Sequence, residues 1–199
     1  MKRELNLKNA YDDAYRLGCQ KLMEAGTEDY PIHFFGKECC VVCKEGSVTF
    51  ESAEQLGTTE KIIILHYLAG PRNAPLTGKL ISFKEVPGGG AIYYDTFKLR
   101  SIDPLVDVFS KDPDGMTEAA KQLGGSPGTV GDASVVLYAL PQIPVTYVVW
   151  LGDDEIEPNG TILFDSSIET FLPVEDIVVA ASYGSLKLIR AWKDKKGLC

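Results

Sequence analysis

The order of apolar and polar positions predicts helices and strands in the first part of the chain. Over 9–25, apolar or small residues recur at helical spacing, and Asn9 is the expected helix start. Over 32–50, β-branched, aromatic and Cys residues are broken by two glycine-containing turns, which predicts two or three short antiparallel strands. A second helix fits 58–69, with Thr58 as its N-cap, and its nearly continuous apolar surface indicates deep burial.

The rest of the chain continues in a mixed order. Strands are expected at 80–83, 134–140, 145–151 and 161–164. Helical segments are expected to begin at Asp103, Asp114, Asp165 and Pro173, and a glycine-rich loop is expected at 87–90. Because strands and helices do not alternate regularly, we predict an α+β fold with a mixed or antiparallel sheet, or sheets, and packed helices. The length of 199 residues suits a single globular domain, 1–199, with frayed ends at 1–8 and 193–199.

Charge is spread unevenly over the chain. The net charge is −8: residues 1–100 hold 13 basic and 13 acidic groups, whereas 101–199 hold 7 and 15. Since an acidic surface repels phosphate, no nucleic acid and no membrane is expected as a partner, which leaves cations and proteins with a basic surface as candidate partners. The sequence shows no signal-peptide core and no membrane-spanning apolar run, and its five cysteines do not fit a secreted disulfide framework. We therefore expect a cytoplasmic protein with reduced thiols.

The acidic groups of the second half are concentrated in 122–186, which contains nine carboxylates and no Lys, Arg or His. They must face water, bind a cation or pair with basic groups elsewhere, because an unpaired buried charge is costly. Three have positions typical of helix starts: Asp165, Glu175 and Asp176. Three others follow a buried strand, where they could hold Mg²⁺ or Ca²⁺: Asp153, Asp154 and Glu155. The alternative interpretation of this segment is a solvated acidic turn.

A second group of metal-binding residue types lies in the predicted strands: Cys39, Cys40, Cys43 and His33. Thiolates and imidazole bind Zn²⁺ or iron–sulfur clusters. On a strand, however, Cys39 and Cys43 share one face while Cys40 points to the other, so these thiols cannot chelate one ion without a turn. The alternative is that they are free thiols, buried or half-exposed.

Two further sites are suggested by individual residues. His66 lies on the apolar second helix, where it is a candidate acid or base and otherwise a hydrogen-bonded core residue. A mixed-charge pocket would form if basic residues such as Arg72 met acidic groups of the second half beside the glycine-rich loop. The expected lining residues of this pocket are Lys79, Gly88, Gly89, Gly90, Tyr93, Tyr94 and Asp132. Such a pocket would suit a polar or zwitterionic ligand.

Several short segments are similar to those of a known family: 65–68 (LHYL), 76–79 (LTGK), 81–85 (ISFKE), 150–155 (WLGDDE), 163–168 (LFDSSI) and 172–176 (LPVED). Through them the chain resembles domain-of-unknown-function family 3786 of anaerobic bacteria and archaea. The resemblance implies no established activity, although some members are fused to a four-cysteine iron–sulfur module of the kind seen in corrinoid proteins. This sequence contains no such module, so a corrinoid or iron–sulfur role would run through a partner protein or through the domain itself.

These observations lead to two functional hypotheses. The first is a non-catalytic binding or accessory domain, linked through the resemblance to corrinoid- or iron–sulfur-dependent anaerobic metabolism. The second is a divalent-metal-assisted enzyme in which the carboxylates of 153–155 hold the cation and His66 acts as acid or base. The expected cofactor is accordingly a corrinoid or a divalent cation, and the residues do not decide between them.

Overall fold

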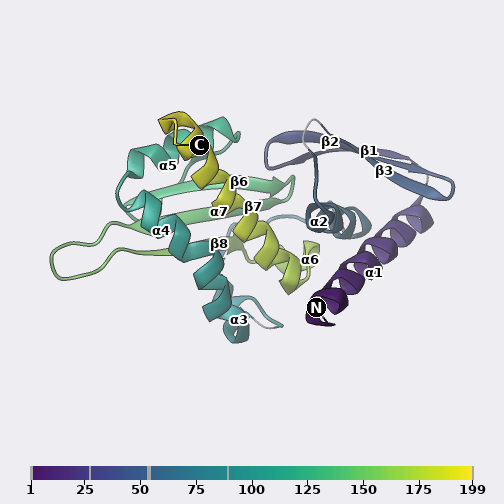
Figure 1. Ribbon diagram of the computed structural model, residues 1–199, viewed down its shortest axis with the longest axis horizontal. Coiled ribbons are helices and arrows are strands. Elements are labelled where there is room, and N and C mark those ends of the chain that lie inside the picture. The colour runs from purple at the N-terminus through teal and green to yellow at the C-terminus, as the bar shows by residue number, and fades with distance from the viewer. Residues whose placement is uncertain (1, 27, 53–54, 89, 199) are drawn as a thin grey trace.

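Helices pack around two antiparallel sheets in the computed structural model of this chain (Figure 1). The structure describes residues 2–26, 28–52, 55–88 and 90–198. One sheet has three strands in the order β1 (Asp29–Phe34), β2 (Lys37–Lys44) and β3 (Ser47–Ser52). The other has five, in the order β4 (Leu80–Ser82), β8 (Asn159–Asp165), β7 (Ile143–Trp150), β6 (Ala133–Leu140) and β5 (Ser126–Pro127). The prediction of an α+β fold with antiparallel sheets is confirmed.

The helices cover both sheets. They are α1 (Lys2–Ala25), α2 (Thr58–Ala69), α3 (Gly90–Phe97), α4 (Asp103–Phe109), α5 (Pro113–Gln122), α6 (Ile168–Phe171) and α7 (Val174–Lys196), with a 3₁₀ turn η1 at Phe83–Glu85 and a π-helical turn η2 at Lys98–Ile102. α1 and α2 pack on each other and against the three-stranded sheet, and α7 crosses the five-stranded sheet (Figure 1). None of the helices in the described ranges is long and apolar enough to cross a membrane.

Two helix starts in the first half differ from the prediction. α1 begins at Lys2 rather than at Asn9. Residues 2–8 are mostly good helix formers, so the helix extends past the capping signal. α2 begins at Thr58, but Gly57 is its N-cap and no side chain caps it. The expected cap Thr58 is therefore the first helical residue.

The largest difference from the sequence-based expectation is a helix over 90–109. The sequence predicts a loop through Gly90 and a helix start at Asp103, but α3, η2 and α4 follow one another without a break. The Asp-Pro signature of a helix start lies inside this run, where the N–H of Asp103 donates to the carbonyl of Lys98. Because Pro104 lacks an N–H, the wider π-helical turn before it accommodates the proline within the helix.

A second Asp-Pro pair starts α5. The N-cap is Asp112 rather than the expected Asp114, and its Oδ1 accepts a hydrogen bond from the N–H of Gly115 at 3.0 Å. Its Oδ2 accepts one from Trp192 Nε1 at 2.8 Å and lies 2.9 Å from Lys196 Nζ. The bonds from Trp192, Lys196 and Gly115 lower the pKa of Asp112 to about 2. Tied in this way to α5, α7 remains helical to Lys196, into the segment 193–199 for which the sequence predicts fraying.

The contact between α5 and α7 should weaken in acid. Because the folded-state pKa of Asp112 lies below that of an unfolded Asp, its stabilising contribution is complete above about pH 4 and is lost as the pH falls towards about 2. Asp112→Asn should therefore lose less unfolding free energy than the wild type between these pH values, by about 1 kcal/mol after solvent screening. Urea unfolding measures the difference, with the exposed Asp114→Asn as control. The same pH dependence in Asp112→Asn and the wild type would contradict this role.

The turn between β1 and β2 joins the two sheets. The N–H of Phe35 donates to the carbonyl of Ala139 in β6 at 3.1 Å. Phe35 and Gly36 have positive φ angles of 48° and 75°. A Cβ on Gly36 would lie 2.4 Å from the carbonyl oxygen of Leu123, so glycine is required where the turn passes the end of α5. The hydrogen bond from Phe35 to Ala139 holds the end of β1 beside the turn that connects β6 and β7.

A buried carboxylate at the end of β8 ties two loops together. Asp165 is 5% exposed. Its Oδ1 accepts hydrogen bonds from the N–H and hydroxyl groups of Thr77 and Ser167, and its Oδ2 accepts one from the N–H of Gly78. Burial raises the pKa of Asp165, but the bonds from Ser167 and Thr77 outweigh it and leave the pKa lowered. The helix expected to begin at Asp165 begins instead at Ile168.

The core between the five-stranded sheet and α7 depends on one close contact. Tyr147 of β7 is fully buried, and its hydroxyl donates to the carbonyl of Ala181 at 3.2 Å. Burial raises the pKa of Tyr147, so the phenol stays protonated. A Cβ on Gly184 would lie 1.8 Å from Tyr147 Oη. Glycine at this position therefore allows α7 to approach β7.

Candidate functional site

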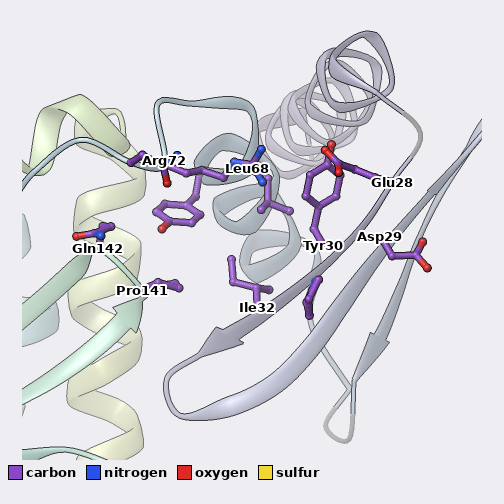
Figure 2. Close-up of a pocket in the computed structure, with 11 residues that line it drawn as sticks. Glu28, Asp29, Tyr30, Ile32, Leu68, Arg72, Pro141 and Gln142 are labelled. Carbon is purple, nitrogen blue, oxygen red and sulfur yellow. The ribbon is translucent and has the colours of Figure 1, made fainter.

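A cleft of about 490 Å³ opens between β1, the end of α2 and the turn that connects β6 and β7 (Figure 2). This volume lies in the range of small-molecule sites, about 300–1,000 Å³. Each of the three walls contributes an apolar side chain: Ile32, Leu68 and Pro141. The polar lining residues are Glu28, Asp29, Tyr30, Tyr67, Arg72, Asn73 and Gln142. This cleft, termed the Arg72 cleft, combines apolar and charged groups, as binding sites for polar small molecules do.

The end of α2 places Arg72 at the cleft. The N–H of Gly70 donates to the carbonyl of Tyr67 at 3.2 Å, and the N–H of Arg72 donates to the carbonyl of Gly70 at 3.0 Å. Pro71 lies between them and cannot continue a helix. The chain therefore turns after α2 and carries Arg72 over the ring of Tyr30, with the guanidinium carbon 4.9 Å from the ring centroid.

The guanidinium of Arg72 is available to a ligand. Arg72 is half-buried, and its guanidinium makes no ion pair or side-chain hydrogen bond within the part of the chain that the structure describes. The contact with Tyr30 restrains the guanidinium without using its N–H donors. Figure 2 shows the Glu28 carboxylate near the ring of Tyr30, whereas Asp29 points away from it. A planar fork of free donors suits an anionic group with two oxygens.

Two tyrosine hydroxyls add neutral polar groups to the cleft. Burial raises the pKa of Tyr30, and the charge of Glu28 together with a hydrogen bond to Glu28 raises it further. Burial also raises the pKa of Tyr67, partly offset by a hydrogen bond from the backbone of Gln142 and by the charge of Arg72. Both phenols therefore stay protonated at neutral pH and act as hydrogen-bonding groups rather than as bases.

The structure separates two residues of the pocket predicted from the sequence. Lys79 directly precedes β4, which pairs with the Asp165 end of β8. The carboxylate of Asp132 accepts a hydrogen bond from the N–H of Leu151, just after β7 and beside the Asn159 end of β8. These are opposite ends of one strand, so Lys79 and Asp132 do not share a small site. Gly89, another predicted lining residue, lies outside the described residues.

Three other predicted residues of that pocket, Gly88, Gly90 and Tyr94, have structural roles. A Cβ on Gly90 would lie 1.9 Å from the carbonyl oxygen of the first residue of η1, so this glycine is needed for backbone packing. Gly88 has a φ angle of +75°, which favours glycine. Tyr94 lies beneath Lys84, whose Nζ is 4.1 Å from the ring centroid, and Tyr93 is exposed. These contacts and backbone angles give Gly88, Gly90 and Tyr94 structural roles that do not require a ligand.

The acidic segment after β7 forms a turn that protrudes from the molecule (Figure 1). Oδ1 of Asp153 accepts hydrogen bonds from the backbone N–H groups of Glu155 and Ile156 at 2.8 and 2.9 Å, and these bonds lower the pKa of Asp153. Asp154 and Glu155 are exposed. In the described ranges, no group of three or more His, Cys, Asp or Glu side chains is arranged to hold a metal ion. The contacts support a solvated acidic turn and give no support to a metal site.

The thiols of β2 are distributed over both faces of the strand. Cys39 and Cys43 are buried, whereas Cys40 is half-buried. Burial raises the pKa of each of the three thiols. His33, the fourth residue of the predicted thiol site, is exposed at the other strand of the hairpin. A raised pKa disfavours the thiolate that a metal requires, so the free-thiol interpretation is the better supported one.

His66 connects α2 to α7. Its Nδ1 lies 2.6 Å from Oδ2 of Asp176, a residue 110 positions later in the chain. Asp176, which the sequence identifies only as a first-turn residue, is 7% exposed. Neither residue lines the Arg72 cleft. The pair favours the structural interpretation of His66, because the imidazole is held by a buried carboxylate between two helices.

Several residues of the cleft are not singled out by the sequence. Glu28 and Tyr30 lie at the start of a strand, and Gln142 lies in a two-residue turn, where polar residues are ordinary. The available signal is Arg72, because a basic residue directly after the Gly-Pro end of a buried helix must lie close to the core. The position of Arg72 therefore predicts the wall formed by the end of α2, but not the walls formed by β1 and by the turn between β6 and β7.

Comparison with known proteins gives one family match. A family model described as Domain of unknown function (DUF3786) matches residues 12–186. No curated protein and no solved structure matches the chain. The matched range runs from within α1 to within α7 and includes every wall of the Arg72 cleft.

Proposed function

The chain belongs to the DUF3786 family, which is described only as a domain of unknown function, and on this premise we propose that it is a non-catalytic binding domain. Its ligand is a small polar molecule held in the Arg72 cleft. The observation that carries the proposal is the half-buried guanidinium of Arg72, which has no ionic partner in the described chain. A charge partly removed from water is costly unless it is paired, so a ligand that pairs with it gains affinity.

The lining of the cleft supports binding rather than covalent catalysis. Among the described residues that line it, none is Ser, Thr, Cys, His or Lys, so Glu28 and Asp29 are the carboxylates that remain as candidate bases or nucleophiles, and Asp29 points away from the ring of Tyr30. The two phenols have raised pKa values and do not supply a phenolate. The groups that remain are suited to holding a ligand in one orientation.

A ligand of the cleft should raise the melting temperature, because a molecule that binds only the folded state stabilises it. In a thermal-shift screen of amino acids, dicarboxylates, sugars, nucleosides and polyamines, we expect at least one compound to give a shift of about 5 °C at saturation. Asn73→Trp places a large ring at the exposed edge of the cleft and should abolish that shift.

The matched control is Thr49→Trp, at an exposed position of β3 outside the cleft. It should leave the ligand-induced shift unchanged. A screen without any stabilising compound would overturn the proposal, and so would a shift that survives equally in both variants.

A corrinoid is the cofactor alternative that the family resemblance suggests, and it is too large to be enclosed by the cleft of about 490 Å³, so it would bind across the edge of the cleft or elsewhere. Titration of the protein with a corrinoid should change the visible spectrum at stoichiometric concentrations, because the ligands of the cobalt or their surroundings change on binding. An unchanged spectrum would count against the cofactor alternative and leave the small-ligand proposal in place. A spectral change that persists in Asn73→Trp would place the corrinoid outside the Arg72 cleft.

A further inference from the structure

Two opposite charges of the Arg72 cleft are separated by one tyrosine ring. The guanidinium of Arg72 lies over the ring of Tyr30, whose hydroxyl bonds to the carboxylate of Glu28. Arg72 and Glu28 do not form an ion pair with each other or with another side chain of the described residues. Figure 2 shows both side chains on the Tyr30 side of the cleft. The cleft therefore presents one cation and one anion, and each is open to a partner of opposite charge.

The anionic part of a matching ligand is a carboxylate. The guanidinium presents paired N–H donors that match the two oxygens of a carboxylate. A phosphate would also fit the fork, but it would bring close to two negative charges beside Glu28 and the exposed Asp29. A singly charged carboxylate avoids most of this repulsion.

The cationic part of the ligand is matched by Glu28. The carboxylate of Glu28 is exposed, uses one contact, with Tyr30, and retains further acceptor positions. It therefore favours an ammonium group on its side of the cleft.

The apolar lining of the cleft is suited to a hydrocarbon group of the ligand. Ile32 and Leu68 expose only 5% and 4% of their surface, and Pro141 faces them from the opposite wall. An aliphatic group packed on these side chains would remove mainly its own surface from water, which favours binding. A sugar or a nucleoside would leave Arg72 unpaired.

We infer that the Arg72 cleft binds a free α-amino acid with an apolar side chain. Its carboxylate pairs with Arg72, its ammonium group pairs with Glu28, and its side chain packs on Ile32 and Leu68. The inference rests on the proposed function, of which it names the ligand class.

Calorimetric titration of the full chain with three related probes tests the inference. L-leucine carries both charges, L-leucinamide lacks the carboxylate, and N-acetyl-L-leucine lacks the ammonium group. Leucine should bind, and each modified probe should bind about tenfold or more weakly, because each loses one charge-assisted interaction. This comparison uses the wild-type protein and does not depend on the folding of a variant.

Variants then assign each charge to its partner. Arg72→Gln should weaken leucine binding about tenfold or more but leave leucinamide unaffected, and Arg72→Lys should restore part of the loss. Glu28→Gln should weaken leucine but not N-acetyl-leucine. The controls Arg100→Gln and Glu45→Gln change exposed residues outside the cleft and should alter none of the affinities.

The outcomes separate this inference from the proposed function. Equal affinities for the three probes, or no leucine binding, would overturn the amino-acid inference. If another compound of the screen then bound in a manner sensitive to Asn73→Trp, the proposed binding function would stand. If no compound bound, both would fall.

Discussion

Gly184→Ala is expected to lower the free energy of unfolding by about 3 kcal/mol, because it overpacks the core. The added Cβ would lie 1.8 Å from Oη of Tyr147 and 2.8 Å from a ring carbon of Phe35. Tyr147 is 0% and Phe35 is 1% exposed, so neither ring has free space to move into. The sign of the change is informative, since the same substitution in an unconstrained helix stabilises by about 1 kcal/mol.

Denaturant unfolding of the wild type and the variant measures this difference. Tyr147→Phe alone should cost about 1 kcal/mol, the contribution of its hydrogen bond to Ala181. Combined with Gly184→Ala it should cost less than the sum, because the hydroxyl that meets the new methyl group is absent. Leu186→Ala, at an exposed position of the same helix, should change stability by no more than about 0.5 kcal/mol. A Gly184→Ala protein as stable as the wild type would contradict the close approach of α7 to β7.

The elements that the sequence predicts correctly are those with a strong local pattern. The helix at 58–69, the strands within 32–50 and the last helix after Pro173 are all present. In each, apolar spacing and turn residues act over a few neighbouring positions, and burial reinforces the same choice. The α+β class follows from the order of these elements.

The errors arise where a local signal competes with its surroundings. The Asp-Pro pair at Asp103 is a valid helix start by itself, but the preceding residues already form a helix and a π-helical turn leads directly into it. The glycines at 87–90 predict a loop, and the helix begins at Gly90 because only glycine fits against η1 there. At both positions the tertiary packing determines the backbone conformation. A short window of sequence does not contain the residues that pack there, so it cannot predict the outcome.

The acidic stretch shows the same limit for the candidate site. Within the described residues, Asp176 of this stretch meets a basic residue of the first half, His66. Asp132, Asp153 and Asp165 are bonded mainly by backbone N–H groups and hydroxyls, which stabilise a carboxylate without a cation. Arg72 consequently lacks an acidic partner from that stretch. The Arg72 cleft could not be derived from the sequence, because its walls come from three distant segments.

The second large effect is expected at Asp165, where Asp165→Asn should lower the free energy of unfolding by about 3 kcal/mol at neutral pH. The carboxylate accepts bonds on both oxygens, from Thr77 and Ser167 on Oδ1 and from Gly78 on Oδ2. An amide has only one acceptor oxygen, so its NH₂ group would face a donor and leave a buried N–H unpaired. Ser166→Ala is the control, because that hydroxyl bonds to Thr77 and not to Asp165.

The effect of Asp165→Asn should also depend on pH. Because the folded-state pKa of Asp165 is lowered, the carboxylate stabilises the fold fully above the ordinary pKa of an Asp, about 4, and progressively less as the pH falls below it. The difference in unfolding free energy between wild type and variant should therefore be largest near neutral pH and shrink in acid. Urea unfolding at a series of pH values measures it. A difference that stays constant into the acid range would show that the shape of the side chain, and not its charge, holds the Thr77 and Ser167 loops together.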